Sequence, residues 1–202
     1  MKKFLSLTLV VIMALSLFTG CAKPAPAPSG EPAAPAEAEV IKLGVFEPLT
    51  GANAAGGELE LEGIELAHEL YPEVLGKKVE LVVVDNKSDK VEAATAAARL
   101  VEKEKVSAII GSWGSSLAMA AGDIVRNAKV PAMGTSCTNP LVTQGNDYYF
   151  RVCFIDPFQG VVMSNYAYNN LGAKKAAIVQ EVSNDYAVGL AKFFTDNFKK
   201  LT

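Results

Sequence analysis

The sequence predicts an α/β fold in which a parallel sheet carries helices on both faces. Strand-like and helix-like segments alternate from Val40 to the end of the chain. The segments at 78–85 and 106–111 are continuous apolar or β-branched runs, as in parallel strands that are buried on both faces. The segments between them carry apolar residues at helical spacing or are rich in alanine. This alternation is the pattern of a parallel sheet with helical connections.

The first half of the expected domain holds three strands and two helices. In order they are a strand at 40–46, a helix at 57–70, a strand at 78–85, a helix at 89–105 and a strand at 106–111. The first helix has acidic residues opposite its apolar stripe, and Pro72 and Gly76 end it. The second helix is rich in alanine, and Asp89 is its expected N-cap.

The second half continues the alternation. The expected elements are a helix at 115–128, a strand at 130–134, a loop at 135–147, a strand at 148–152, a helix at 159–170, a strand at 174–180 and a helix at 186–200. The loop contains Asn139 before Pro140, and a residue before proline rarely stays helical.

The N-terminus has the pattern of an exported lipoprotein. Lys2 and Lys3 precede an apolar run at 4–18, and two small residues precede Cys21. We expect a signal peptide at 1–20, a lipidated Cys21 followed by a Pro/Ala-rich linker to residue 39, and an extracytoplasmic domain anchored to a membrane by the lipid, in the periplasm or on the outer face of the cytoplasmic membrane. A transmembrane anchor is the alternative, but the run is shorter than the roughly 20 residues that span a bilayer. A plain secretory signal is the other alternative.

Composition excludes several classes of function. The 202 residues carry 19 Lys and Arg against 22 Asp and Glu, which argues against a nucleic-acid partner. One histidine and three cysteines offer no metal-ligand spacing, and we expect Cys137 and Cys153 to be separate thiols, the latter in an apolar strand. GxGxxG, GxxxxGK[ST] and GxSxG are absent from the sequence. We therefore expect a binder with no cofactor and no metal rather than an enzyme.

A ligand site is expected beyond the carboxyl ends of the strands, where ligands bind in such sheets. The loops there lie at 47–57, 85–88, 112–116 and 134–139, and we expect the cleft mainly from the first, third and fourth. In GSWGSS, Ser115 and Ser116 open a helix, a position that favours a carboxylate. Alternatively, Ser115 merely caps that helix.

Two further features point to the same cleft. Trp113 is the only tryptophan of the sequence, and its loop position suggests a wall over a ligand. The hydroxyl and carbonyl groups of TSCTNP (135–140) could bind an ammonium or a second carboxylate oxygen. An ordinary Asn-Pro turn is the alternative for this segment.

From Ile41 to its end, the chain resembles a known family. The matching segments are IKLGVFEPLTG, VVVDNKSD, IIGSWGSS, the TNP turn with VTQGN, YYFRVCFIDPFQG and AIVQEVSNDYAVGL. They resemble the substrate-binding lipoproteins of ABC transporters for branched-chain amino acids, of the Leu/Ile/Val-binding type, with a type I periplasmic-binding fold. That resemblance implies two lobes that close over a ligand. It implies a first lobe at 40–157 and, at 158–202, the start of a second lobe that longer relatives continue.

The resemblance also implies roles for particular residues. The residues implied to contact the ligand are Trp113, Gly114, Ser115, Ser136, Cys137, Thr138 and Tyr186. Ser115 and its loop amides would hold the α-carboxylate, and Tyr186 would close from the second lobe. Asp156 and Gln159 match the crossover between lobes and are expected to be structural. Relatives often carry an aromatic residue in the first loop, where this chain reads AAGG, so the side-chain specificity stays open.

The function that the resemblance implies is capture of a small amino acid, branched-chain or otherwise aliphatic, and its delivery to the membrane subunits of an ABC permease. One alternative is a ligand-sensing receptor domain of the same fold for amino acids, amides or similar small molecules. The other is a hydrolase, which would need a nucleophile and a base, and the sequence does not assemble them.

Overall fold

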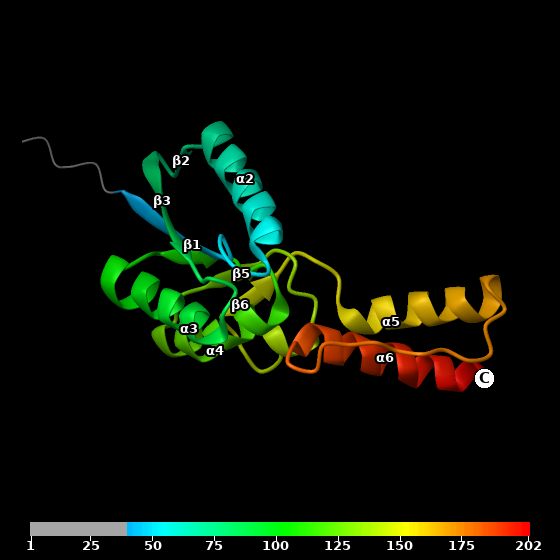
Figure 1. Ribbon diagram of the computed structural model, residues 1–202. Coiled ribbons are helices and arrows are strands. Elements are labelled where there is room, and N and C mark those ends of the chain that lie inside the picture. Colours follow the sequence, from blue (N-terminus) through cyan, green and yellow to red (C-terminus); the bar gives the residue numbers. More distant parts are fainter. Residues whose placement is uncertain (1–39) are drawn as a thin grey trace, which may run out of the picture. The chain divides into compact units, whose positions relative to one another are not determined.

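A computed structural model describes residues 40–202 (Figure 1). The expected signal peptide, the lipidation of Cys21 and the linker lie outside the described residues. Within the described part, none of the helices combines the length and the apolar character needed to cross a bilayer.

The sheet has six strands in the order β2-β3-β1-β4-β5-β6. The strands are β1 (Ile41–Glu47), β2 (Glu73–Val74), β3 (Lys77–Asp85), β4 (Ala108–Ile110), β5 (Ala132–Gly134) and β6 (Tyr149–Arg151). All neighbouring pairs are parallel except β2 with β3, a short hairpin that the sequence analysis missed. The predicted α/β class with a mainly parallel sheet is confirmed.

Helices connect the strands and continue beyond them. They are α2 (Ala54–Leu70), α3 (Lys90–Ala98), α4 (Ser115–Ala128), α5 (Asp156–Asn165) and α6 (Asp185–Leu201). π-helical turns extend α3 (Arg99–Glu104) and α5 (Tyr166–Asn170), and a 3-10 turn (Pro140–Val142) lies in the expected loop. Asp89 is the predicted N-cap of α3, because its carboxylate accepts the N–H groups of Val91 and Glu92.

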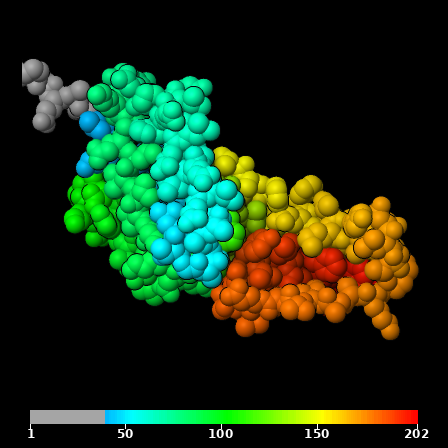
Figure 2. All heavy atoms as spheres, turned by 45° about the horizontal axis from the view of Figure 1, so that its top comes forward, coloured from blue at the N-terminus to red at the C-terminus, as the bar shows by residue number. Residues whose placement is uncertain are grey.

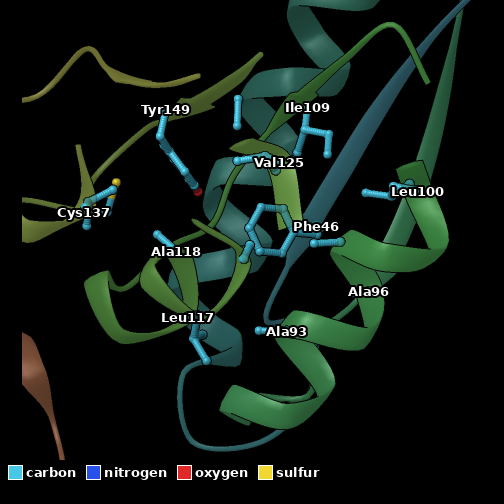
Figure 3. Close-up of a cluster of buried hydrophobic side chains, with 14 of the residues drawn as sticks. Phe46, Ala93, Ala96, Leu100, Ile109, Leu117, Ala118, Val125, Cys137 and Tyr149 are labelled. Atoms are coloured by element: carbon cyan, nitrogen blue, oxygen red, sulfur yellow. The ribbon is translucent and has the colours of Figure 1, made fainter. Parts of the chain in front are cut away.

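The hydrophobic core lies where α3 and α4 cover one face of the sheet (Figure 3). Phe46 of β1 and Ile109 of β4 meet Leu100 and Leu117 there, all essentially buried. Alanines form the facing sides of the two helices, at 93, 96 and 97 in α3 and at 118 and 121 in α4. Their small side chains let the helices approach each other closely, so this face is a rigid base for the loops above it.

The helix α2 covers the opposite face of the sheet, so the predicted two-sided cover is confirmed (Figure 1). Its attachment includes a polar contact, because Nε2 of His68 lies 2.9 Å from the carbonyl oxygen of Val79 in β3. A carbonyl oxygen can only accept, so that ring nitrogen carries the proton. His68 is therefore a structural residue of the helix–sheet contact.

Beyond the sheet, α5 and α6 pack side by side (Figure 1). Gly160 makes the close approach possible, because a Cβ at that position would overlap the backbone and Cβ of Phe193. The amide of Asn197 donates to the Ser164 hydroxyl across the same contact, at 2.6 Å. These helices are the part of the chain that the resemblance assigns to a second lobe.

Two expectations about local structure were wrong. Residues 174–180 are not a strand, because the described residues provide no neighbouring strand whose backbone could pair with them. Val179 is completely exposed there. Cys153 lies just after β6 rather than within it, and both Cys137 and Cys153 are free thiols.

Candidate functional site

A cavity of about 590 Å³ opens between the strand-end loops and the start of α6. In Figure 2 the segment that leads into α2 (cyan) lies beside the segment that leads into α6 (orange). The lining residues are Asn53, Ser88, Asp89, Lys90, Trp113, Gly114, Ser115, Ser116, Leu117, Ser136, Thr138, Phe154, Gln159, Glu181, Ser183, Asn184 and Tyr186. The volume lies in the range that is usual for sites that bind small molecules.

The cleft differs in detail from the expected one. The second loop, expected to contribute little, supplies Ser88 and continues into α3 with Asp89 and Lys90. The first loop supplies only Asn53. Gln159, expected to be structural, also lines the cavity, whereas Asp156 is buried beneath it and accepts a hydrogen bond from the Gln159 amide at 3.1 Å. Burial raises the pKa of Asp156 above its usual value.

The GSWGSS loop opens α4 toward the cavity. Gly114 has φ +92°, a value that favours glycine, and α4 begins at the next residue. Ser115 does not cap the helix, because its buried Oγ accepts the backbone N–H of Asn139 at 3.1 Å. The hydroxyl proton of Ser115 and the first N–H groups of α4 are therefore available at the cavity wall, where they suit a carboxylate.

The second predicted segment contributes two of its three expected residues. Ser136 and Thr138 line the cavity, and the buried Thr138 hydroxyl forms no hydrogen bond of standard geometry with the described residues. Cys137 is not brought to the cavity, because its side chain points into the core beside Gly134 and Tyr149 (Figure 3). Burial raises the pKa of its thiol to about 12, so the group stays a neutral thiol.

Trp113 lines the cavity and packs against the start of α2. Its indole occupies the space above Gly56, where a Cβ would overlap ring atoms. The residues AAGG, expected in the first loop, form the first turn of α2, and their small size leaves room for the Trp113 ring.

Sequence analysis missed the residues that hold the Trp113 loop from below. Glu47 accepts the Trp113 N–H at 2.6 Å, the amide of Asn86 donates to the Ser112 hydroxyl at 2.8 Å, and the Tyr149 hydroxyl donates to the Gly111 carbonyl at 2.7 Å. All three side chains are essentially buried. Glu47 ends β1, Asn86 directly follows β3 and Tyr149 begins β6. The one signal in the sequence was therefore a polar residue at the edge of an apolar run.

The start of α6 is attached through Asp185 to the first turns of α3 and α4 and to the loop that contains Asn139. Its N–H donates to the Ser116 hydroxyl, its carbonyl accepts from the Asn139 amide, and its carboxylate pairs with Lys90 at 2.8 Å. The Lys90 contact is the main cause that lowers the pKa of Asp185. Tyr186, the next residue, thereby reaches the cavity.

Replacing Lys90 by methionine should weaken this attachment only modestly. Both partners of the ion pair are partly exposed, so the expected loss of unfolding free energy is about 0.5 kcal/mol. Chemical denaturation at low and at high salt measures it, since the difference should shrink as salt screens the wild-type pair. The matched control is Lys192→Met, which removes an exposed ion pair within α6 itself.

The described residues contain no cluster of histidine, cysteine, aspartate and glutamate arranged to hold a metal ion. The cavity instead combines a helix N-terminus, hydroxyl groups and aromatic walls from separate segments. A parallel α/β domain with such a cavity at its strand ends belongs to the class of α/β ligand-binding domains.

The chain is a member of the periplasmic binding protein family, whose profile matches residues 40–202. It is 36% identical over 165 residues to an amino acid binding protein of Pseudomonas aeruginosa, covering 80% of this chain and 44% of that protein. Two solved structures are similar. The leucine binding protein LivK of Thermotoga maritima has a TM-score of 0.79 at 50% identity, with 80% of this chain and 46% of that one covered.

The second structure is the branched-chain amino acid transporter substrate binding protein LivJ of Streptococcus pneumoniae, solved in complex with isoleucine. It has a TM-score of 0.75 at 38% identity, and 80% of this chain and 47% of that one are covered. The chain thus spans less than half the length of these relatives. The family is one of substrate-binding proteins rather than of enzymes, and its location is extracytoplasmic.

Proposed function

We propose that the chain belongs to the extracytoplasmic substrate-binding component of an ABC importer that captures a small, branched-chain or other aliphatic amino acid. Its relatives support this proposal, since they are amino acid, leucine and branched-chain amino acid binding proteins. The proposal includes residues 40–157 as the first lobe and 158–202 as the beginning of a second. It also includes export by a signal peptide, lipid anchoring at Cys21 and delivery to permease subunits.

The observation that carries the proposal is the chemistry of the cavity. Ser115 and the first turn of α4 offer hydrogen-bond donors to an α-carboxylate, and the Thr138 hydroxyl, which faces Asp156, lines the same cavity. The Ser136 hydroxyl also lines the cavity, and its oxygen can accept a hydrogen bond from an ammonium. Trp113, Leu117 and Phe154 provide the apolar lining that an aliphatic side chain requires.

The mechanism that we propose is a population shift. Ligand groups that contact both the strand-end loops and Tyr186 are satisfied only when the two parts are together, so binding favours the closed arrangement. The permease would then recognise closure. No bond of the ligand is made or broken in this mechanism.

The proposal is tested by titrating leucine, isoleucine, valine and 4-hydroxybenzoate while the fluorescence of Trp113 is recorded. Ser115→Ala and Thr138→Val should each weaken leucine binding about tenfold, because each removes a hydrogen bond to a charged ligand group. The matched controls are Ser164→Ala and Thr195→Val, whose hydroxyl groups bond only to residues of α5 and α6 and do not line the cavity. Equal affinity in all four variants, or preference for the benzoate, would contradict the proposed ligand class.

A further inference from the structure

We propose that Glu47 is a positioning residue for the candidate site, whose buried carboxyl fixes the backbone of Trp113 and thereby the loop that presents Ser115. The consequence for ligand affinity rests on the proposed function. The fixation of the loop does not, because it is a property of the chain without ligand.

The geometry ties the carboxyl directly to the loop. Glu47 is the last residue of β1 and is completely buried. Its Oε2 accepts the Trp113 N–H at 2.6 Å, two residues before α4 begins. Gly111 passes immediately above the other oxygen, since a Cβ there would lie 2.8 Å from Oε1, and its φ of +123° favours glycine. The carboxyl is therefore enclosed by the loop that it holds.

The second oxygen, Oε1, shows which form of the carboxyl fits this place. It is buried and has no donor as a partner among the described residues. An ionised carboxylate with one unsatisfied oxygen in the core is strongly unfavourable, whereas the neutral acid carries a proton that it can donate. Glu60 of α2 is the neighbouring acceptor, and its own carboxylate is also held by the Thr135 hydroxyl.

The neighbouring titratable groups favour the same form. Burial raises the pKa of Glu47 to about 9, and the negative charge of Glu60 adds to that increase. Tyr149 of β6 also interacts with Glu47, and burial raises the pKa of its phenol as well. At neutral pH the neutral acid accepts from Trp113 on one side and donates toward α2 on the other. Glu47, at the end of β1, thus links the Trp113 loop to α2.

The experiment compares Glu47→Gln and Glu47→Leu in the 202-residue chain, with the emission of Trp113 and its quenching by acrylamide as readouts. Trp113 is the only tryptophan, so the signal reports this loop. Glutamine keeps an acceptor for the Trp113 N–H and a donor toward Glu60, and should leave both readouts unchanged. Leucine removes the acceptor and should raise the quenching constant about twofold by freeing the loop. Val45→Ala is the control, since it weakens the packing of the same buried strand but keeps the acceptor of the Trp113 N–H.

A pH series keeps the proposal testable even where Glu47→Leu fails to fold. Quenching of the wild type should rise between about pH 8 and about pH 10, because ionisation places a buried negative charge beside Glu60 with Oε1 unsatisfied and so disturbs the packing under the loop, while Glu47→Gln stays constant. Equal curves for these two proteins, or equal disturbance by the glutamine and leucine variants, would overturn the proposal. Leucine titrations of the same proteins should show about tenfold weaker binding only for Glu47→Leu. If the wild type binds no leucine but the quenching differences appear, the proposed function fails and the positioning role stands.

Discussion

Replacing Arg151 by methionine should lower the free energy of unfolding by about 3 kcal/mol, the loss of several charge-assisted hydrogen bonds in a partly buried place. Its guanidinium donates to the carbonyls of Cys137 and Asn139 at 2.9 Å each. It also donates to the Pro140 carbonyl and to the Thr143 hydroxyl. One side chain of β6 therefore holds the entire segment that brings Thr138 to the cavity. Urea denaturation measures the effect.

Two variants separate this role from a general effect of charge. Arg151→Lys keeps the charge but lacks the planar fork of donors, so it should recover less than half of the loss. Arg126→Met removes an arginine whose contacts, with Asp123 and with the Gly145 carbonyl, are exposed. Its expected cost is below about 0.5 kcal/mol. Equal losses for Arg151→Met and Arg126→Met would show that the loop does not depend on Arg151.

Replacing Glu47 by glutamine should stabilise the protein increasingly as pH rises. The pKa of this buried acid is about 9 in the folded chain against an ordinary value of 4.5, so the folded state binds one more proton between these values. Wild-type stability should therefore fall with pH through this window, by about 1.4 kcal/mol per pH unit, and level off above the upper pKa. The glutamine variant has no such proton to lose. Its free energy of unfolding relative to the wild type should therefore rise by about 3 kcal/mol between about pH 4.5 and pH 7.

The measurement is the free energy of unfolding at several pH values between the two pKa values. Glu80→Gln, which removes an exposed carboxyl from the neighbouring strand β3, is the matched control and should stay within about 0.5 kcal/mol of the wild type. A constant difference between the glutamine variant and the wild type across the window would mean that Glu47 is ionised in the folded state.

The parts of the fold that follow from local chemistry could be predicted from the sequence. Apolar β-branched runs, alanine-rich helices and the Asp89 cap depend on residues that are close in sequence. The prediction of a strand at 174–180 was wrong because it depends on a distant partner, since a strand forms only where another strand pairs with it. Strand propensity alone did not decide its conformation.

The site was predictable to a similar degree. Ser115, Trp113 and Thr138 stand in loops at strand ends, a place that topology alone marks as functional, and the structure brings them to one cavity. Cys137, between two lining residues, points into the core instead, where it packs against Gly134 and Tyr149, and the sequence of the loop did not show this. In the sequence, Glu47 and Asn86 look like ordinary polar residues at the ends of strands, so their role in the site was not predicted. Their pairing with the loop at 111–113 depends on contacts between residues far apart in sequence.

The exposed segment at 174–180 has a consequence for handling the protein. Its backbone forms no ladder with a described strand, and Ile178 and Val179, like Val182 just beyond the segment, present apolar side chains to solvent. An extended, unprotected run of this kind is a template for strand addition between molecules. Self-association of the chain at high concentration should therefore start at this run, and a charged residue placed at Val179 should keep preparations monodisperse.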